Sequence, residues 1–169
     1  MKRWLLLLAL LAGVAHAIAP DKLTLGKEPV VDQAAMLAPA ETAALNQKLR
    51  TLHEAQVMQG AIVLVDNLNG MSDFDYGMAV FQRWQLGDKD KDNGLLLVIG
   101  RDNRQFRLIT GRGLEGALPD VAVRKLLQGQ LVPNFRQQRY AEGIGWGEAK
   151  QALFEKINEE LAPARERYQ

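Results

Sequence analysis

Short apolar runs alternate with amphipathic stretches along this chain. Residues 61–65 and 95–99 are uninterrupted apolar runs, as expected of strands that are buried on both faces of a sheet. The polar pair Asp102-Asn103 predicts a tight turn, and the alternating residues 106–110 after it predict the second strand of a β-hairpin. Another short strand is expected at residues 30–32. The pattern therefore predicts a sheet of about four strands.

Helical periodicity occupies the intervals between these strands. Leu45, Leu49 and Leu52 recur at the spacing of one helical face, after Pro39 in the favoured first-turn position. Ser72 is suited to cap a second helix. Buried strands that alternate with amphipathic helices predict an α/β fold, a three-layer α/β/α sandwich with a small mixed sheet. Two more helices are expected farther along the chain, at residues 119–127 and 139–161.

The first 17 residues have the three parts of a secretory signal peptide. Lys2 and Arg3 precede a leucine-rich run, and small residues lead up to a cleavage site near Ala17. The apolar run is about half as long as the ~20 residues that a membrane-spanning helix needs. We therefore expect a periplasmic or secreted protein with no transmembrane anchor after cleavage. Residues 18–29 are predicted to be a loosely held arm, residues 30–161 the folded domain, and residues 162–169 a C-terminal tail.

Charge and cysteine content narrow the possible functions. Cleavage would remove two basic residues, which leaves 19 basic against 20 acidic side chains, so the overall charge does not favour nucleic acid as a partner. The chain has no cysteine, which excludes thiol catalysis and thiolate metal sites. An exported protein without cysteines is more typical of a bacterial periplasm than of disulfide-rich extracellular modules.

Several carboxylates fall in predicted loops or at the ends of predicted elements. Carboxylate oxygens from separate loops can bind Ca²⁺ or Mg²⁺ without histidine or cysteine, provided that the fold brings them together. The loop that starts at Asp88 is not an EF-hand, because the glycine and the glutamate of that motif are missing from their positions. A solvated loop tip is the alternative interpretation of Asp88 and Asp90, which alternate with lysines. The dispersed candidates are Asp32, Asp92, Glu115 and Asp120, and Asn93 lies beside them at the start of a buried strand.

Three other motifs are weaker. His53 is the only histidine outside the predicted signal peptide, and we interpret it as a surface or boundary residue. The glycines at 143, 145 and 147 lie within a helical pattern, which favours close helix packing over phosphate binding. Arg107 alternates with apolar residues, so its guanidinium is placed to bind phosphate or carboxylate across the sheet surface, although a solvated hairpin face is the alternative.

Several segments, taken in order, resemble the TPM domain family, which is also called TPM-phosphatase-like. The resemblance covers about residues 30–161. It implies an α/β/α sandwich. Some members of the family are associated with divalent-metal binding and acid-phosphatase activity. The matching segments are Val31-Asp32 with Leu37, residues 81–84, residues 92–96, residues 109–116 followed by Asp120, residues 133–136, and Tyr140 with Gly143-Ile144.

The resemblance makes five positions candidates for a metal or reaction centre that would hold Ca²⁺ or Mg²⁺: Asp32, Asp92, Asn93, Glu115 and Asp120. If the domain is a phosphatase, Asp92 and Asp120 are the candidate catalytic residues, and Arg107 or Arg112 would hold the phosphate. Many bacterial relatives continue into a transmembrane helix and a glycine-rich tail, and this sequence stops soon after its last predicted helix.

Two functions remain open at this point. The first is an exported binding, assembly or repair factor that has a cation site and acts on another envelope protein. Roles of the family in repair and receptor modulation favour it. The second is a metal-assisted phosphatase that acts on a phosphorylated small molecule.

Overall fold

The computed structural model describes residues 17–116, 118, 119, 121, 124, 128, 132 and 133. The helix expected at 139–161 lies outside these residues, and most of the one expected at 119–127 does too. The described strands are β1 (Val30–Asp32), β2 (Gln59–Val65), β3 (Gly94–Gly100) and β4 (Gln105–Thr110). The described helices are α1 (Pro39–Glu54) and α2 (Asp73–Trp84), with the short 3-10 helices η1 (Pro20–Lys22) and η2 (Arg112–Leu114).

The four strands form one mixed sheet in the order β1-β2-β3-β4. β1, β2 and β3 are parallel, and β4 runs antiparallel to β3 as the second strand of the predicted hairpin. All seven residues of β3 are buried, which explains why the strand is an uninterrupted apolar run. The mixed four-stranded sheet is confirmed.

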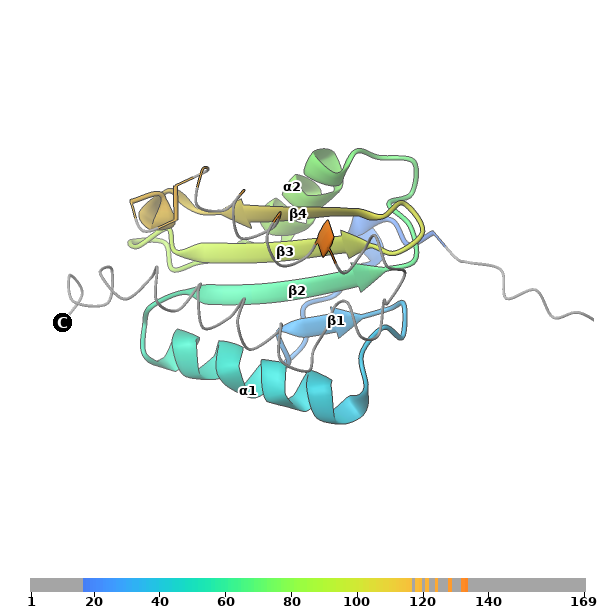
Figure 1. Cartoon of the computed structure of the whole chain (residues 1–169). Coiled ribbons are helices and arrows are strands. Elements are labelled where there is room, and N and C mark those ends of the chain that lie inside the picture. The colour runs from blue at the N-terminus through green and yellow to red at the C-terminus, as the bar shows by residue number, and fades with distance from the viewer. Residues whose placement is uncertain are drawn as a thin grey trace, which may run out of the picture.

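One helix covers each face of the sheet, so the described part of the fold has three layers (Figure 1). Alternate residues of the central strands point to opposite faces: Ile62 and Leu64 pack with α1, whereas Ala61 and Val63 pack with α2. The leucines predicted for one face of α1 are all buried against the sheet. Removing apolar surface from water on both faces stabilises the two helices against one sheet.

Local signals set the helix starts where the sequence predicts them. Pro39 occupies the first turn of α1, and Ser72 caps α2 by accepting a hydrogen bond from the Asp75 backbone N–H at 3.0 Å. Gln85 ends α2 in the left-handed conformation. No helix among the described residues is both long enough and apolar enough to span a bilayer.

The N-terminal arm is part of the fold, in contrast to the loosely held segment expected from its mixed composition. Leu23 is buried in the apolar cluster on the α2 face of the sheet. The Tyr76 hydroxyl donates a hydrogen bond to the Ile18 carbonyl at 2.6 Å, and the Trp84 indole N–H donates to the Leu23 carbonyl at 3.3 Å. The sequence pattern missed these contacts because they join residues about 60 positions apart.

Candidate functional site

The parallel strands place Asp32 and Asp92 at opposite ends of the strands. We call these ends the C-terminal edge, where β1, β2 and β3 finish, and the N-terminal edge, where they start. Asp32 ends β1 and lies in register with Leu64, near the C-terminal ends of the parallel strands. Asp92 and Asn93 precede β3, whose first residue pairs with Gln59 at the other end of β2. Five strand residues separate the two levels, or about 16 Å at the usual rise per residue. One ion therefore cannot bind both Asp32 and Asp92.

Asp32 holds the chain between β1 and α1. Its carboxylate accepts hydrogen bonds from the backbone N–H groups of Ala34 and Met36, each at 3.1 Å, and of Leu37 at 2.8 Å. Three donors to one carboxylate occupy most of its acceptor positions and leave little capacity for a metal.

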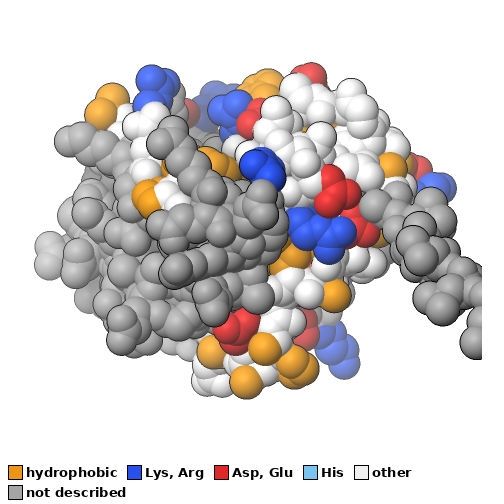
Figure 2. Space-filling model, turned by 45° about the vertical axis from the view of Figure 1, so that its right-hand side comes forward, with side chains coloured by type: hydrophobic (Ala, Val, Ile, Leu, Met, Phe, Trp, Pro, Cys, Tyr) orange, Lys and Arg blue, Asp and Glu red, His pale blue; other side chains and the backbone are white. Residues whose placement is uncertain are grey.

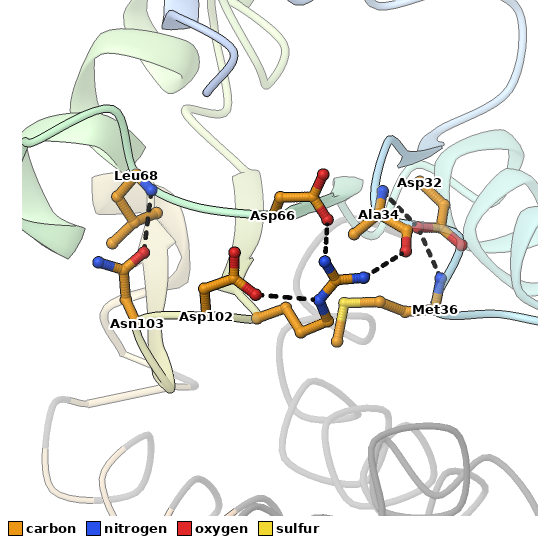
Figure 3. Close-up of polar contacts among 8 residues, drawn as sticks. Asp32, Ala34, Met36, Asp66, Leu68, Asp102 and Asn103 are labelled. Carbon is orange, nitrogen blue, oxygen red and sulfur yellow. Dashed lines mark hydrogen bonds and ion pairs between the residues drawn. The ribbon is translucent and has the colours of Figure 1, made fainter. Parts of the chain in front are cut away.

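The C-terminal edge contains an ion cluster that the sequence analysis did not single out. The guanidinium group of Arg101 contacts the carboxylates of Asp66 and Asp102 and the carbonyl of Ala34 (Figure 3). The Arg101 Nε donates to Asp102 at 3.2 Å, and its Nη1 donates to Ala34 at 3.1 Å. Basic and acidic side chains lie together on this side of the molecule (Figure 2). The arginine thus supplies the positive charge that these carboxylates require.

The sequence did contain a signal for this cluster. Asp66 directly follows the first long apolar run, and Arg101-Asp102 follow the second run after a single glycine, Gly100. The carboxyl ends of neighbouring parallel strands lie at one edge of a sheet, which is where α/β folds usually bind ligands.

Asn93 has a structural role at the opposite edge. Its side chain is 1% exposed, its Oδ1 accepts a hydrogen bond from the Asp88 N–H at 2.9 Å, and its Nδ2 donates to the Val57 carbonyl at 3.2 Å. Both polar atoms are therefore used to hold the 87–94 loop against the chain before β2.

Asp92 is more accessible than Asn93. Its side chain is 53% exposed, and its Oδ2 accepts a hydrogen bond from the Arg112 N–H at 3.3 Å. Asp92 has a positive φ of 48°, and its carbonyl accepts a hydrogen bond from the Gly113 N–H at 2.9 Å. These bonds bring the loop after β4 against the loop before β3.

Gly111 and Gly113 make this close approach possible. A Cβ added to Gly111 would collide with the Asp92 carbonyl, and one added to Gly113 would collide with the Lys91 carbonyl. The two glycines therefore serve tight backbone packing between the loops.

At neither edge do the described residues alone supply the set of ligands that a divalent cation needs. No group of three or more His, Cys, Asp or Glu side chains converges among the residues that the structure describes. Asp32 and Asn93 are engaged by protein groups, and Arg101 neutralises the other carboxylates of the C-terminal edge. Asp120 lies outside the described residues, so its place beside Asp92 and Glu115 stays a prediction.

A broad groove of about 990 Å³ runs along β4. Every residue of β4 lines it. One wall comes from α2 through Asp73, Phe74 and Met78, and the other includes Glu115, Leu118 and Arg124. Arg107 and Glu115, two of the predicted site residues, thus share this groove, whereas Asp32, Asp92 and Asn93 do not line it.

Arg107 is fixed on the α2 side of the groove. Its Nη2 donates to Asp73 at 2.7 Å and its Nε at 3.2 Å, and the guanidinium carbon lies 5.8 Å from the centre of the Phe74 ring. The Asp73 carboxylate therefore already neutralises much of the positive charge of Arg107 that was expected to bind phosphate. The apolar Phe74 ring beside it remains 51% exposed.

Comparison with known proteins identifies relatives of the whole domain. Residues 30–149 match the TPM domain. The solution structure of the N-terminal domain of a P. gingivalis protein is 27% identical, covers 86% of this chain and 95% of that chain, and superposes with a TM-score of 0.75. The N-terminal domain of cg2496 from Corynebacterium glutamicum shares the fold at 14% identity, with coverage of 87% and 88% and a TM-score of 0.58.

Curated sequences match only a part of the chain. The tryptophan–tRNA ligase of Xanthomonas axonopodis pv. citri is 59% identical over 32 residues, which are 19% of this chain and 7% of the ligase. The Bordetella pertussis ligase is 37% identical over 75 residues, which are 41% of this chain and 17% of the ligase. The chain therefore spans less than a fifth of the length of these relatives, and the match assigns it no ligase activity.

Proposed function

Since the chain belongs to the TPM domain family, we propose that it is an exported binding domain that acts on another protein of the cell envelope. The observation that carries this proposal is the groove along β4, which is large and open and has an exposed aromatic ring in one wall. Exposed apolar surface beside charged side chains is typical of sites that bind other proteins.

The groove is better suited to binding than to hydrolysis. The carboxylate of Asp73 is paired with Arg107, and Thr110 supplies the one hydroxyl group among the described lining residues. No hydrogen bond among the described residues joins the Thr110 hydroxyl to a side chain that could act as its base, which activation of a hydroxyl nucleophile requires.

Site-specific photo-cross-linking in the periplasm tests the proposal. A photoreactive phenylalanine analogue at Phe74 should form a discrete adduct with an envelope protein, whereas the same analogue at the exposed Ala44 on α1 should not. Reversing a groove charge with Arg104→Glu should weaken the Phe74 adduct at least several-fold. Equal adducts at both positions, or none at Phe74, would contradict a binding role for the groove.

A metal-assisted phosphatase that acts on a phosphorylated small molecule is the second candidate. The half-exposed Asp92 carboxylate, which accepts a hydrogen bond from the Arg112 N–H, favours it. In this case Ca²⁺ or Mg²⁺ should raise the melting temperature of the exported protein after EDTA treatment, since a ligand of the native state stabilises it. Hydrolysis of p-nitrophenyl phosphate should then require the metal.

Two asparagine substitutions separate a specific site from general charge effects. Asp92→Asn should abolish both the thermal shift and the hydrolysis, whereas Asp90→Asn, at the exposed tip of the same loop, should leave both unchanged. No shift at millimolar metal and no turnover would remove the phosphatase candidate.

A further inference from the structure

We propose that the groove binds its partner by strand addition, in which an extended acidic segment of another protein pairs with the edge of β4 that no described strand occupies. This inference rests on the binding function proposed above. It adds to that function the mode of recognition and the chemistry of the segment that is recognised.

The backbone of β4 is oriented for such pairing. β4 is the last strand of the sheet order, and no other described strand pairs with its outer edge. The Gly111 N–H donates to Gly94 at 2.8 Å, which makes these two residues a hydrogen-bonded pair in the antiparallel ladder. Hydrogen-bonded and non-hydrogen-bonded pairs alternate along a ladder. The backbone N–H and C=O groups of Ile109 and Arg107 therefore point toward β3, and those of Leu108 and Thr110 point away from it.

The lining of the groove can contact both sides of an extended chain. α2 contributes Phe74 and Met78, the segment after β4 contributes Glu115, Leu118 and Arg124, and all six residues of β4 line the same groove. The six residues of β4 extend about 20 Å, which matches an added strand of similar length. Main-chain hydrogen bonds would supply affinity, and contacts with the walls would supply specificity.

The charges of the groove favour an acidic segment. Arg104 and Arg124 both line it, and neither forms an ion pair with another residue that the structure describes. Arg107 is already paired with Asp73, so among the described lining residues Glu115 is the remaining acidic side chain against two arginines. Apolar contacts come from Phe74 and from the half-buried Leu108, which suits a segment that alternates acidic and apolar residues.

The same charges disfavour pairing between two copies of this chain. Pairing of β4 with β4 of a second copy would bring together two groove linings in which Arg104 and Arg124 face only Glu115 among the described residues. Two linings with the same excess of positive charge repel each other, whereas an acidic segment supplies the opposite charge. The occupant is therefore a partner segment of opposite charge.

Backbone N-methylation of a peptide probe tests strand addition directly. The probe is a capped peptide of alternating Glu and Val, eight residues long, prepared with N-methyl groups either on all odd or on all even residues. Only the N–H groups of the odd residues or those of the even residues can point toward β4. The peptide whose β4-facing N–H groups are methylated should bind at least tenfold more weakly than the parent, and the other peptide should bind nearly as well as the parent. A peptide of alternating Lys and Val should bind at least tenfold more weakly than the parent.

Amide exchange on the exported protein locates the contact. The parent peptide should slow hydrogen exchange of the Leu108 and Thr110 amides, while the amide of Asn69, in the loop before α2, stays unchanged. Leu108→Pro removes an outward-pointing N–H, which an edge strand tolerates, and should weaken binding similarly. If this variant does not fold, the pair of N-methylated peptides still decides the matter.

The outcomes separate this inference from the proposed function. Equal binding of both N-methylated peptides, no protection of Leu108 and Thr110 at millimolar peptide, or a dimer that forms through β4 would overturn strand addition. If the groove binds its partner in another way, both N-methylated peptides bind equally or Leu108 and Thr110 are not protected, but the Phe74 cross-link to an envelope protein still forms. Loss of that cross-link together with peptide binding would remove the proposed function as well.

Discussion

At the scale of single residues, polar side chains serve the architecture in two places where the sequence suggested chemistry. Asn93 directly precedes β3 and Asp32 ends β1, and both direct their side-chain atoms to backbone groups. A loop carboxylate or amide has the same appearance in the sequence whether its oxygens face a metal or the backbone. Only the positions of the nearby N–H groups decide between these roles.

Replacing Asn93 tests its structural role. Asn93→Ala leaves the Asp88 N–H and the Val57 carbonyl without their partners, and it should lower the free energy of unfolding by about 2–3 kcal/mol. Asn67→Ala, which removes a side-chain bond to the exposed Asn69 N–H, should cost less than about 1 kcal/mol. Urea denaturation measures both values, and equal losses would argue against a special role for Asn93.

Arg101 offers a second test at this scale. Arg101→Gln removes the charge between Asp66 and Asp102 and should destabilise the fold by about 1–2 kcal/mol, because the pairs are only partly exposed. Arg101→Lys keeps the charge but cannot bridge all three acceptors, so an intermediate loss is expected. The difference between the two variants should shrink in 1 M salt, and a loss for Arg101→Gln that is independent of salt would contradict the electrostatic explanation.

At the scale of elements, the hairpin and the loops around it show how close packing sets residue choice. The loop after β4 lies against the loop before β3, and Gly113 approaches the Lys91 carbonyl too closely for any side chain. Composition predicts a loop here. It does not predict that this loop packs rigidly against another one.

Gly113→Ala should therefore be strongly destabilising. The added methyl group forces the two loops apart, and we expect a loss of about 2–3 kcal/mol in the free energy of unfolding. Gly26→Ala is the matched control, because a Cβ there meets no atom within 4 Å. A chemical denaturation midpoint that shifts no more for Gly113→Ala than for the control would show that the loops separate at little cost.

At the scale of the whole molecule, contacts distant in sequence connect the N-terminal arm to α2. Tyr76 is fully buried and bonds to Ile18, and burial raises the pKa of Tyr76 from 10.0 to about 12. Between these values the unfolded chain loses the phenol proton while the folded chain keeps it. The free energy of unfolding therefore falls as the pH rises from 10 to 12, by about 1.4 kcal/mol for each unit of pKa shift that is realised.

Tyr76→Phe isolates this effect. The variant lacks the titrating group and the bond to Ile18, so it should be less stable than the wild type at pH 8. The stability difference between the two proteins should narrow from pH 10 upward, as measured by urea denaturation at several pH values. A difference that stays constant to pH 12 would mean that the phenol titrates alike in both states.

The sequence by itself determined most of the described fold. The apolar runs of β2 and β3, the hairpin turn, Pro39 at the start of α1 and the Ser72 cap all act through neighbouring residues, and their patterns are therefore readable along the chain. The ordered set of segments between residues 30 and 149 also sufficed to indicate the TPM family.

Only the tertiary structure decided which polar groups meet. Strand direction separates Asp32 from Asp92 by the length of the sheet, and it brings Arg101 between carboxylates from two strand ends. The groove depends likewise on α2 and the residues after β4 standing on either side of one edge strand. The physical reason is that the spacing of apolar residues specifies which face of one helix or strand is buried. A site also depends on the register and relative direction of two or more elements, and no short stretch of the sequence specifies these.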